Sequence, residues 1–249
     1  MDVAGLIAAL DLPDSAHVDQ RVPKKLLLEN GAPTASDKRY INDGVEELHW
    51  VAALKPTTIG VPDYRDEIRE YLEIAVLHMR LRAEAKAGRL VELVHRAVPY
   101  PVLLLAEHGE RPGLSAAHKR WSQGEAGKTV LDGEVVAVEW DAMHGPAFCD
   151  ALAQGRQPRT TLYALYQGWI DTLLALQAAR VTGTFTKPAS SERTAARREA
   201  LQEYTRLEAE FTRLRTAAAK EKQFQRQVVL NFELKRVQAA LATIIKKLL

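Results

Sequence analysis

The chain has 249 residues, of which 47% are hydrophobic and 27% are charged, the balance of an ordinary globular protein. This length allows one sizeable core, or one core plus an extension. A single cysteine, Cys149, excludes an internal disulfide and favours a reducing, cytoplasmic setting. The first residues lack the basic leader of a signal peptide, and no uninterrupted apolar run approaches the roughly 20 residues that cross a bilayer.

The small net charge of +2 conceals an uneven distribution along the chain. Residues 189–249 contain 13 Lys and Arg against 7 Asp and Glu, a net charge of +6. The preceding residues contain 21 basic and 25 acidic side chains, a net charge of −4. Such charge segregation bears on partners more than on the fold.

The part before Pro188 is expected to fold as an α+β domain. In chain order, the expected elements are helices at 3–10 and 36–54, strands at 57–61 and 69–80, a helix at 83–98, a hairpin at 102–121, a strand at 135–138 and a helix at 160–180. Runs of neighbouring strands joined by short turns favour a small antiparallel or mixed sheet with helices on one face. We expect an N-terminal lead segment at 1–20, the α+β domain at 21–185 and a helical coiled-coil tail at 186–249.

The tail has no glycine or proline over its last 61 residues and carries two apolar heptad patterns. The first consists of Tyr204, Leu207, Phe211, Leu214 and Ala218, and the second of Leu230, Leu234, Val237, Leu241, Ile244 and Leu248. The two patterns do not share one register, and the slip lies within 220–229. Either one continuous helix of roughly 90 Å or two shorter helices joined by a bend would fit. Without Gly, Pro or Asn in the slip, the continuous helix is favoured, and another surface is expected to cover its apolar stripe.

One short stretch, GEAGKT at 124–129, ends like the phosphate-binding loop of nucleotide hydrolases. That loop needs a first glycine where this chain has Ser122, and a helix must follow it so that its N–H groups meet the phosphates. The stretch instead lies between two expected strands. We therefore interpret it as a polar connection between strands.

Other catalytic and metal-binding patterns are incomplete. Restriction-type nucleases place an Asp and then Glu-x-Lys on adjacent strands; Asp63 could supply the first part, but Glu73 is followed by Ile and Ala. The seven histidines show no pair at zinc-ligand spacing, and His144 near Cys149 lacks an orienting third group. We therefore expect no metal, no cofactor and no catalytic residues.

Three stretches resemble the bacterial family catalogued as domain of unknown function 4391. They are RVPKKLL at 21–27 with the later VEELHWVAALKPTTIGV, the passage VPYPVLLLAEH, and KEKQFQRQVVLNFELKRVQAAL in the tail. The resemblance runs from about Arg21 to the end of the chain. It implies a bacterial protein often encoded beside helicases and DNA methyltransferases of restriction-like or phage-defence systems, and it supplies no catalytic residues.

We therefore expect a non-enzymatic accessory subunit of such a system. Its partner would be a helicase, a methyltransferase or a second copy, bound through the C-terminal coiled coil, because polar residues in an apolar seam tend to specify a partner. The alternative is a DNA-binding protein or a divergent metal-dependent nuclease, since basic side chains can also contact phosphates. The candidate contact residues are Lys220, Lys222, Gln223, Arg226 and Asn231 in the tail, with Arg21, Lys24 and Lys25 as a second group.

Overall fold

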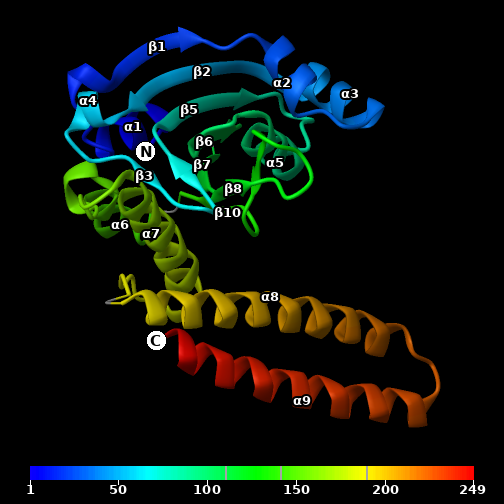
Figure 1. Ribbon diagram of the computed structural model, residues 1–249. Helices are drawn as coiled ribbons and strands as arrows, with labels where there is room; N and C mark the ends of the chain where they lie inside the picture. The colour runs from blue at the N-terminus through cyan, green and yellow to red at the C-terminus, as the bar shows by residue number, and fades with distance from the viewer. Residues whose placement is uncertain (110, 141, 189) are drawn as a thin grey trace. The chain divides into compact units, whose positions relative to one another are not determined.

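A six-stranded mixed sheet forms the centre of the first of two compact units (Figure 1). The computed structural model describes residues 1–109, 111–140, 142–188 and 190–249, and the units are Met1–Leu173 and Leu174–Leu249. The strand order is β1-β2-β5-β6-β7-β10; β5 and β6 run parallel, and the other neighbouring pairs run antiparallel. The strands are β1 (His17–Arg21), β2 (Val45–Leu54), β5 (Ile74–Leu81), β6 (Val102–His108), β7 (Arg111–Ala116) and β10 (Val136–Glu139).

Short helices and two small sheets complete this unit. The helices are α1 (Val3–Ala9), α2 (Lys24–Asn30), α3 (Ala35–Gly44), α4 (Pro56–Ile59), α5 (Ala87–Ala97) and α6 (Gly145–Leu152), with 3-10 turns at Asp14–Ala16 and Gln154–Arg156. The small sheets pair β3 (Tyr64–Arg65) with β4 (Glu70–Tyr71), and β8 (Lys119–Trp121) with β9 (Thr129–Leu131). Helix α7 (Leu162–Thr182) begins in the first unit and ends in the second.

The parallel pair β5 and β6 is buried on both faces along the first half of each strand. Helix α5 connects the two strands, as a parallel crossover requires. Leu104 packs into one core with side chains of α2, α3 and α5, whereas its neighbours Leu103 and Leu105 point to the opposite face and are also fully buried. The expected mixed α+β sheet is confirmed, but the expectation of helices on one face needs correction. Helix α1 contacts β6, and the second face is covered as well.

The helix expected over 36–54 is wrong in its second half. Helix α3 ends at Gly44, and residues 45–54 form β2. The strand has register shifts between Val45 and Glu47 and between Trp50 and Ala52. A bulge adds a residue to one strand, so Val45 and Leu48, three positions apart, both reach the same core. This spacing resembles that of a helix.

The strand expected over 57–61 is also wrong, because residues 56–59 form α4. Pro56 occupies the first helical position, where its missing N–H costs nothing. The hydroxyl oxygen of Thr58 accepts a hydrogen bond from the backbone N–H of Lys55 at 2.9 Å. Gly60, at φ +64°, ends the turn in the left-handed conformation that suits glycine. The strand expected over 69–80 is divided, because residues 70–71 form β4 in a small sheet and residues 74–81 form β5 in the large one. Elements α5, β6, β10 and α7 lie close to their expected places.

A buried lysine closes the C-terminal end of α5. The ammonium group of Lys119 donates to the carbonyl oxygens of His95 and, at 2.7 Å, of Val98. Burial, with a smaller contribution from Arg96, lowers the pKa of Lys119 to about 8. A cation at a helix C-terminus is favourable, so the Lys119 ammonium group stabilises the packing of β8 against the end of α5.

An ion pair fixes the start of α3 to α5. Arg89 contacts Asp37 through two hydrogen bonds of 2.8 and 3.0 Å, and the hydroxyl of Thr34 donates to the same carboxylate at 2.7 Å. The hydrogen bonds from Arg89, followed by that from Thr34, lower the pKa of Asp37 to about 2. A carboxyl group whose folded-state pKa is depressed stabilises the fold above its unfolded pKa, about 3.9, and loses that contribution as the pH falls toward the folded value.

We therefore predict that Asp37→Asn lowers the unfolding midpoint at pH 7. It should also flatten the loss of stability of the natural chain between about pH 4 and pH 2. Denaturant unfolding across this pH range measures both effects. Asp14→Asn, at an exposed aspartate, is the matched control. Equal pH profiles for Asp37→Asn and the natural chain would contradict the assignment.

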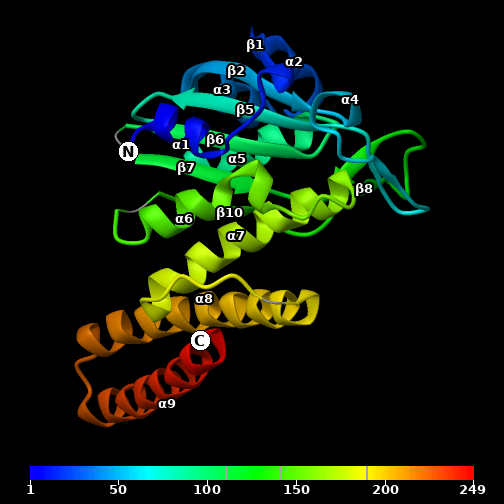
Figure 2. The same ribbon diagram turned by 90° about the vertical axis from the view of Figure 1, so that its left-hand side faces the viewer.

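The second unit contains a helical hairpin. Helix α8 (Ser191–Lys220) and helix α9 (Phe224–Leu248) lie side by side in both views (Figures 1 and 2). Leu207 and Leu214 of α8 are buried together with Val237 of α9. The second heptad pattern therefore packs against the first. Among the described residues, no helix is long and apolar enough to cross a membrane.

The continuous tail helix is wrong, because the chain turns at Glu221–Gln223, inside the register slip. No glycine or proline is needed for this turn. The N–H of Glu221 still bonds to Ala217, and the carboxylate of Glu221 accepts the N–H of Gln223 at 2.8 Å. The expectation that another surface must cover the apolar stripe is corrected accordingly, since each half of the tail covers most of the other.

Spin labels on the two helices distinguish the hairpin from one helix. Cysteines replacing Thr205 and Ala239, both exposed, would be placed in a Cys149→Ser background. Packed helices have axes about 10 Å apart, so we predict a label separation below about 25 Å by pulsed electron paramagnetic resonance. In one straight helix these positions would lie about 50 Å apart, and that separation would refute the hairpin.

Candidate functional site

The tail residues expected to make contacts cluster at the tip of the hairpin. Lys220 ends α8, Lys222 and Gln223 lie in the turn, and Arg226 and Asn231 lie in the first turns of α9. All five side chains are exposed. Their role in binding stays a prediction, but the structure does bring them together at one end of the second unit.

Three exposed apolar side chains lie beside them, and the sequence analysis did not single these out. Phe224 is 77% exposed, Val229 is 57% exposed and Phe232 is 69% exposed. They fall outside the heptad positions that pack against α8. Exposed aromatic residues near one another indicate a surface with a further use. In the sequence, these three residues stand out only by lying outside the apolar heptad positions. That position becomes informative once the structure shows that the heptad positions of α9 pack against α8.

We call the surface formed by Lys220, Lys222, Phe224, Arg226, Val229 and Phe232 the tip surface. Lys235 and Arg236 extend its positive charge along α9. Within the part of the chain that the structure describes, none of these five cations forms an ion pair. Two acidic residues, Glu221 and Glu233, lie in the same stretch, so 220–236 carries a net charge of +3. The tip surface is therefore both apolar and positive.

The second predicted group, Arg21, Lys24 and Lys25, lies in the first unit and has local partners. Arg21 ends β1, with its guanidinium 3.6 Å from the carboxylate of Glu47. Lys24 opens α2, and its ammonium group lies 3.4 Å from the carbonyl of Asn42, near the C-terminus of α3. Burial, then Arg82 and Arg21, lower the pKa of Lys24. Lys25 pairs with Glu29 one helical turn away.

A row of titratable side chains crosses one end of the large sheet. Its members are Glu47 and His49 on β2, His78 and Arg80 on β5, and Glu107 on β6. His49 and His78 are direct cross-strand partners, so their side chains lie on the same face. His49 lies 2.9 Å from Glu47, and His78 lies 3.2 Å from Glu107. The arrangement is two histidine–glutamate pairs side by side, and the hydrogen bond from His49 is the main cause of the lowered pKa of Glu47.

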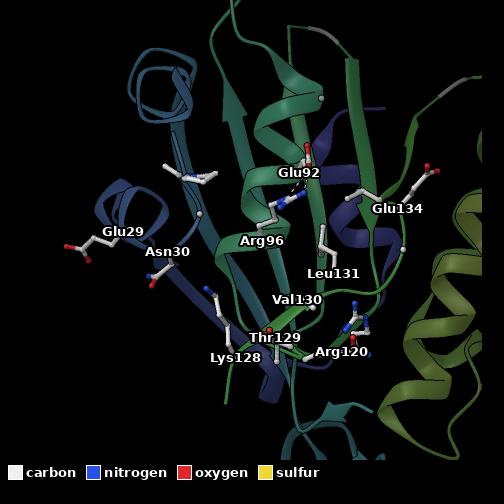
Figure 3. A pocket seen from close by; sticks show the side chains of 18 residues that line it. Glu29, Asn30, Glu92, Arg96, Arg120, Lys128, Thr129, Val130, Leu131 and Glu134 are labelled. Atoms are coloured by element: carbon white, nitrogen blue, oxygen red, sulfur yellow. Dashed lines mark hydrogen bonds and ion pairs between the residues drawn. The ribbon is translucent and has the colours of Figure 1, made fainter. Parts of the chain in front are cut away.

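An open cleft of about 960 Å³ lies between α2, α5 and the β8–β9 hairpin (Figure 3). The polar stretch at 124–129 contributes Lys128 and Thr129 to it. As expected, this stretch joins two strands and no helix follows it. The three cations that line the cleft have acidic partners: Arg96 pairs with Glu92 at 2.7 Å, Lys128 with Glu125 at 2.8 Å and Arg120 with Asp132 at 3.8 Å. The cleft therefore offers little unpaired positive charge to a phosphate.

Asp63 and Glu73, the two residues that match part of the restriction-type nuclease pattern, have different surroundings in the structure. Glu73 is buried just before β5 and pairs with Lys55 at 3.0 Å, whereas Asp63 is exposed. Among the described residues, no group of three or more His, Cys, Asp or Glu side chains could hold a metal ion. Cys149 is half-buried, and burial is the main cause of its raised thiol pKa.

The fold places the chain among mixed α+β proteins with a C-terminal helical segment. The chain belongs to the family described as Domain of unknown function (DUF4391), whose model matches residues 10–241. The expected family is therefore confirmed. No curated protein and no solved structure matches the chain.

The histidine row permits a direct test of side-chain placement. Burial lowers the pKa of His78, and the hydrogen bond with Glu107 opposes that shift. We therefore predict that His78 titrates below the ordinary value of about 6.5, and that Glu107→Gln lowers its pKa further. Side-chain NMR titration measures both. Glu125→Gln, at a carboxylate that pairs with Lys128, should leave His78 unchanged. A rise of the pKa in Glu107→Gln would refute the contact.

Proposed function

We propose that this chain is a non-enzymatic accessory subunit that docks a protein partner through the tip surface of its C-terminal hairpin. The observation that carries the proposal is the exposure of Phe224, Val229 and Phe232 among unpaired cations. Aromatic and arginine side chains dominate the binding energy of protein interfaces. A hairpin that covers its own seam and leaves these three side chains exposed therefore supports docking at the tip.

The hairpin itself acts as a rigid arm in this proposal. We propose that α8 and α9 pack as an antiparallel coiled coil. The heptad spacing of the two apolar patterns supports this, as does the burial of Leu207, Leu214 and Val237 between the helices. A coiled coil would hold the tip surface in a fixed conformation, which reduces the entropy lost on binding.

The charge of the tip surface specifies the partner's chemistry. Five cations around an apolar centre favour an acidic surface with an apolar patch of its own, because complementary potentials speed association and exclude wrong partners. Phe224 and Phe232 also present aromatic faces on which bases can stack, so direct nucleic-acid binding is the rival that the test must separate. The resemblance of the tail motif to the family supports a partner in a DNA-processing or anti-phage defence system, such as a helicase or a methyltransferase.

The test compares the full chain with Phe224→Ser/Phe232→Ser. Biolayer interferometry would measure binding to a helicase and a DNA methyltransferase of the kind that the family resemblance implies, at about 50 and 200 mM salt. We predict binding at both concentrations and a loss of about 100-fold or more in the double variant, because a buried aromatic anchor commonly contributes 2 kcal/mol or more. Thr216→Ala, at an exposed position of α8, is the matched control.

Two results would replace the proposal. Equal binding by the double variant and the natural chain would remove the tip surface from the interface. The rival function, direct nucleic-acid binding, is favoured by the unpaired cations. It would show as oligonucleotide affinity that falls steeply between about 50 and 200 mM salt and that depends on Lys222 and Arg226.

A further inference from the structure

A second, concave surface lies in the first unit, where the RVPKKLL stretch meets the sheet. A pocket of about 300 Å³ is bounded by α2, by strands β2 and β5, and by the residues that follow α5. Its wall is mainly apolar and includes Val22, Leu26, Leu27, Trp50, Val98 and Tyr100. Five of the seven residues of RVPKKLL line it. Ligand sites are typically concave and apolar with a few polar groups, and this volume lies at the small end of their range.

Aromatic and aliphatic groups at the mouth remain uncovered. The rings of Trp50 and Tyr100 lie 6.5 Å apart at 39°. The indole N–H of Trp50 already donates to the carbonyl of Ala52 at 2.9 Å, so this side chain brings no unpaired donor to the pocket. Leu26 is 48% exposed and Tyr100 is 40% exposed. An apolar guest would cover these side chains and gain the corresponding hydrophobic free energy.

The only charged residue that lines the pocket, among those the structure describes, is Arg21. Its contact with Glu47 is long, at 3.6 Å, and the side chain is largely exposed. Lys24 and Arg82 add positive charge nearby, since both Arg82 and Arg21 contribute to the lowered pKa of Lys24. Glu46 and Asp43 oppose them in part. The mouth thus offers a guanidinium that can reorient toward an anion.

We propose that this pocket binds a small amphiphilic organic anion, with its apolar body between Leu26, Trp50 and Tyr100 and its anionic group at Arg21. An extended peptide fits less well. The neighbouring edge strand β1 has a register shift between His17 and Gln20, and Asp19 adopts φ +45°. Such irregularities obstruct the addition of a further strand. The proposal is independent of the docking function, because the pocket lies in the other unit.

The test uses two fluorescent probes of similar shape on the full chain. One is 8-anilinonaphthalene-1-sulfonate, an aromatic anion, and the other is N-phenyl-1-naphthylamine, its neutral counterpart. We expect the anion to bind more tightly. Leu26→Asp should weaken the binding of both probes about tenfold or more, because it replaces an apolar contact that the bound probe would cover with a carboxylate. Arg21→Gln should lower the affinity for the anionic probe about threefold and leave the affinity for the neutral probe unchanged, because a partly exposed ion pair contributes little binding energy.

Two control variants decide whether the signal comes from this pocket. Lys25→Gln removes a charge from the same stretch at a side chain that does not line the pocket, and it should leave both probes unchanged. Phe224→Ser/Phe232→Ser should also leave them unchanged. The inference is overturned if neither probe binds, if Leu26→Asp has no effect while its circular dichroism stays native, or if the signal disappears only in the hairpin variant. The last result would leave the docking proposal intact.

Discussion

The turn at Glu221–Gln223 is the constraint on which the second unit depends. Because it reverses the chain, the two apolar heptad patterns cover each other, and Leu207, Leu214 and Val237 become a core. The same turn determines what stays exposed. Phe224 and Phe232 lie off the seam, so reversing the chain gives them no partner within the hairpin. A helical hairpin buries only one stripe of each helix, and the composition of the outer stripe is therefore free to serve another purpose.

Several charged side chains of the first unit and the cations of the tip surface differ in how they are engaged. In the first unit they hold structure together: Lys119 closes the end of α5, Arg89 joins α5 to the start of α3, and Lys24 lies against the end of α3. At the tip surface the cations have no carboxylate partner within the described part of the chain. This contrast is the physical basis for proposing that the tail makes the contact, since the second predicted group already has partners within its own unit.

The elements that could be predicted are those whose local sequence pattern fits a single type of secondary structure. Helix α5 has a clear helical period and β6 a continuous apolar run, and a proline lies close to each of them. The failures have physical causes. A bulge gave β2 the spacing of a helix, and the two threonines of α4 suggested a strand although Pro56 and Gly60 define a short helical turn. The position of the register slip in the tail was predicted correctly, but the reversal of the chain there was not. The carboxylate of Glu221 accepts the N–H of Gln223 and so stabilises a turn for which glycine was the expected signal.

The contact residues of the tail could be proposed from the slip. The pocket could not, since Trp50 and Tyr100 are distant in sequence and meet only through the sheet.

Two of the stretches that carry the family resemblance form surfaces that the core alone does not require. In RVPKKLL, Leu27 is buried in the core, yet Leu26 is half exposed and Arg21 is held only by a long ion pair. In the tail motif, Leu230, Leu234 and Val237 serve the seam, whereas Phe224 and Phe232 do not. A stable fold would tolerate polar residues at Leu26, Phe224 and Phe232, and exposing them has a cost in solubility. Both stretches combine exposed apolar side chains with a nearby cation, one in a concave pocket and one on a convex tip. We therefore propose two separate recognition surfaces, a pocket for a small guest and a tip for a macromolecule, and we expect a change in one to leave binding at the other intact.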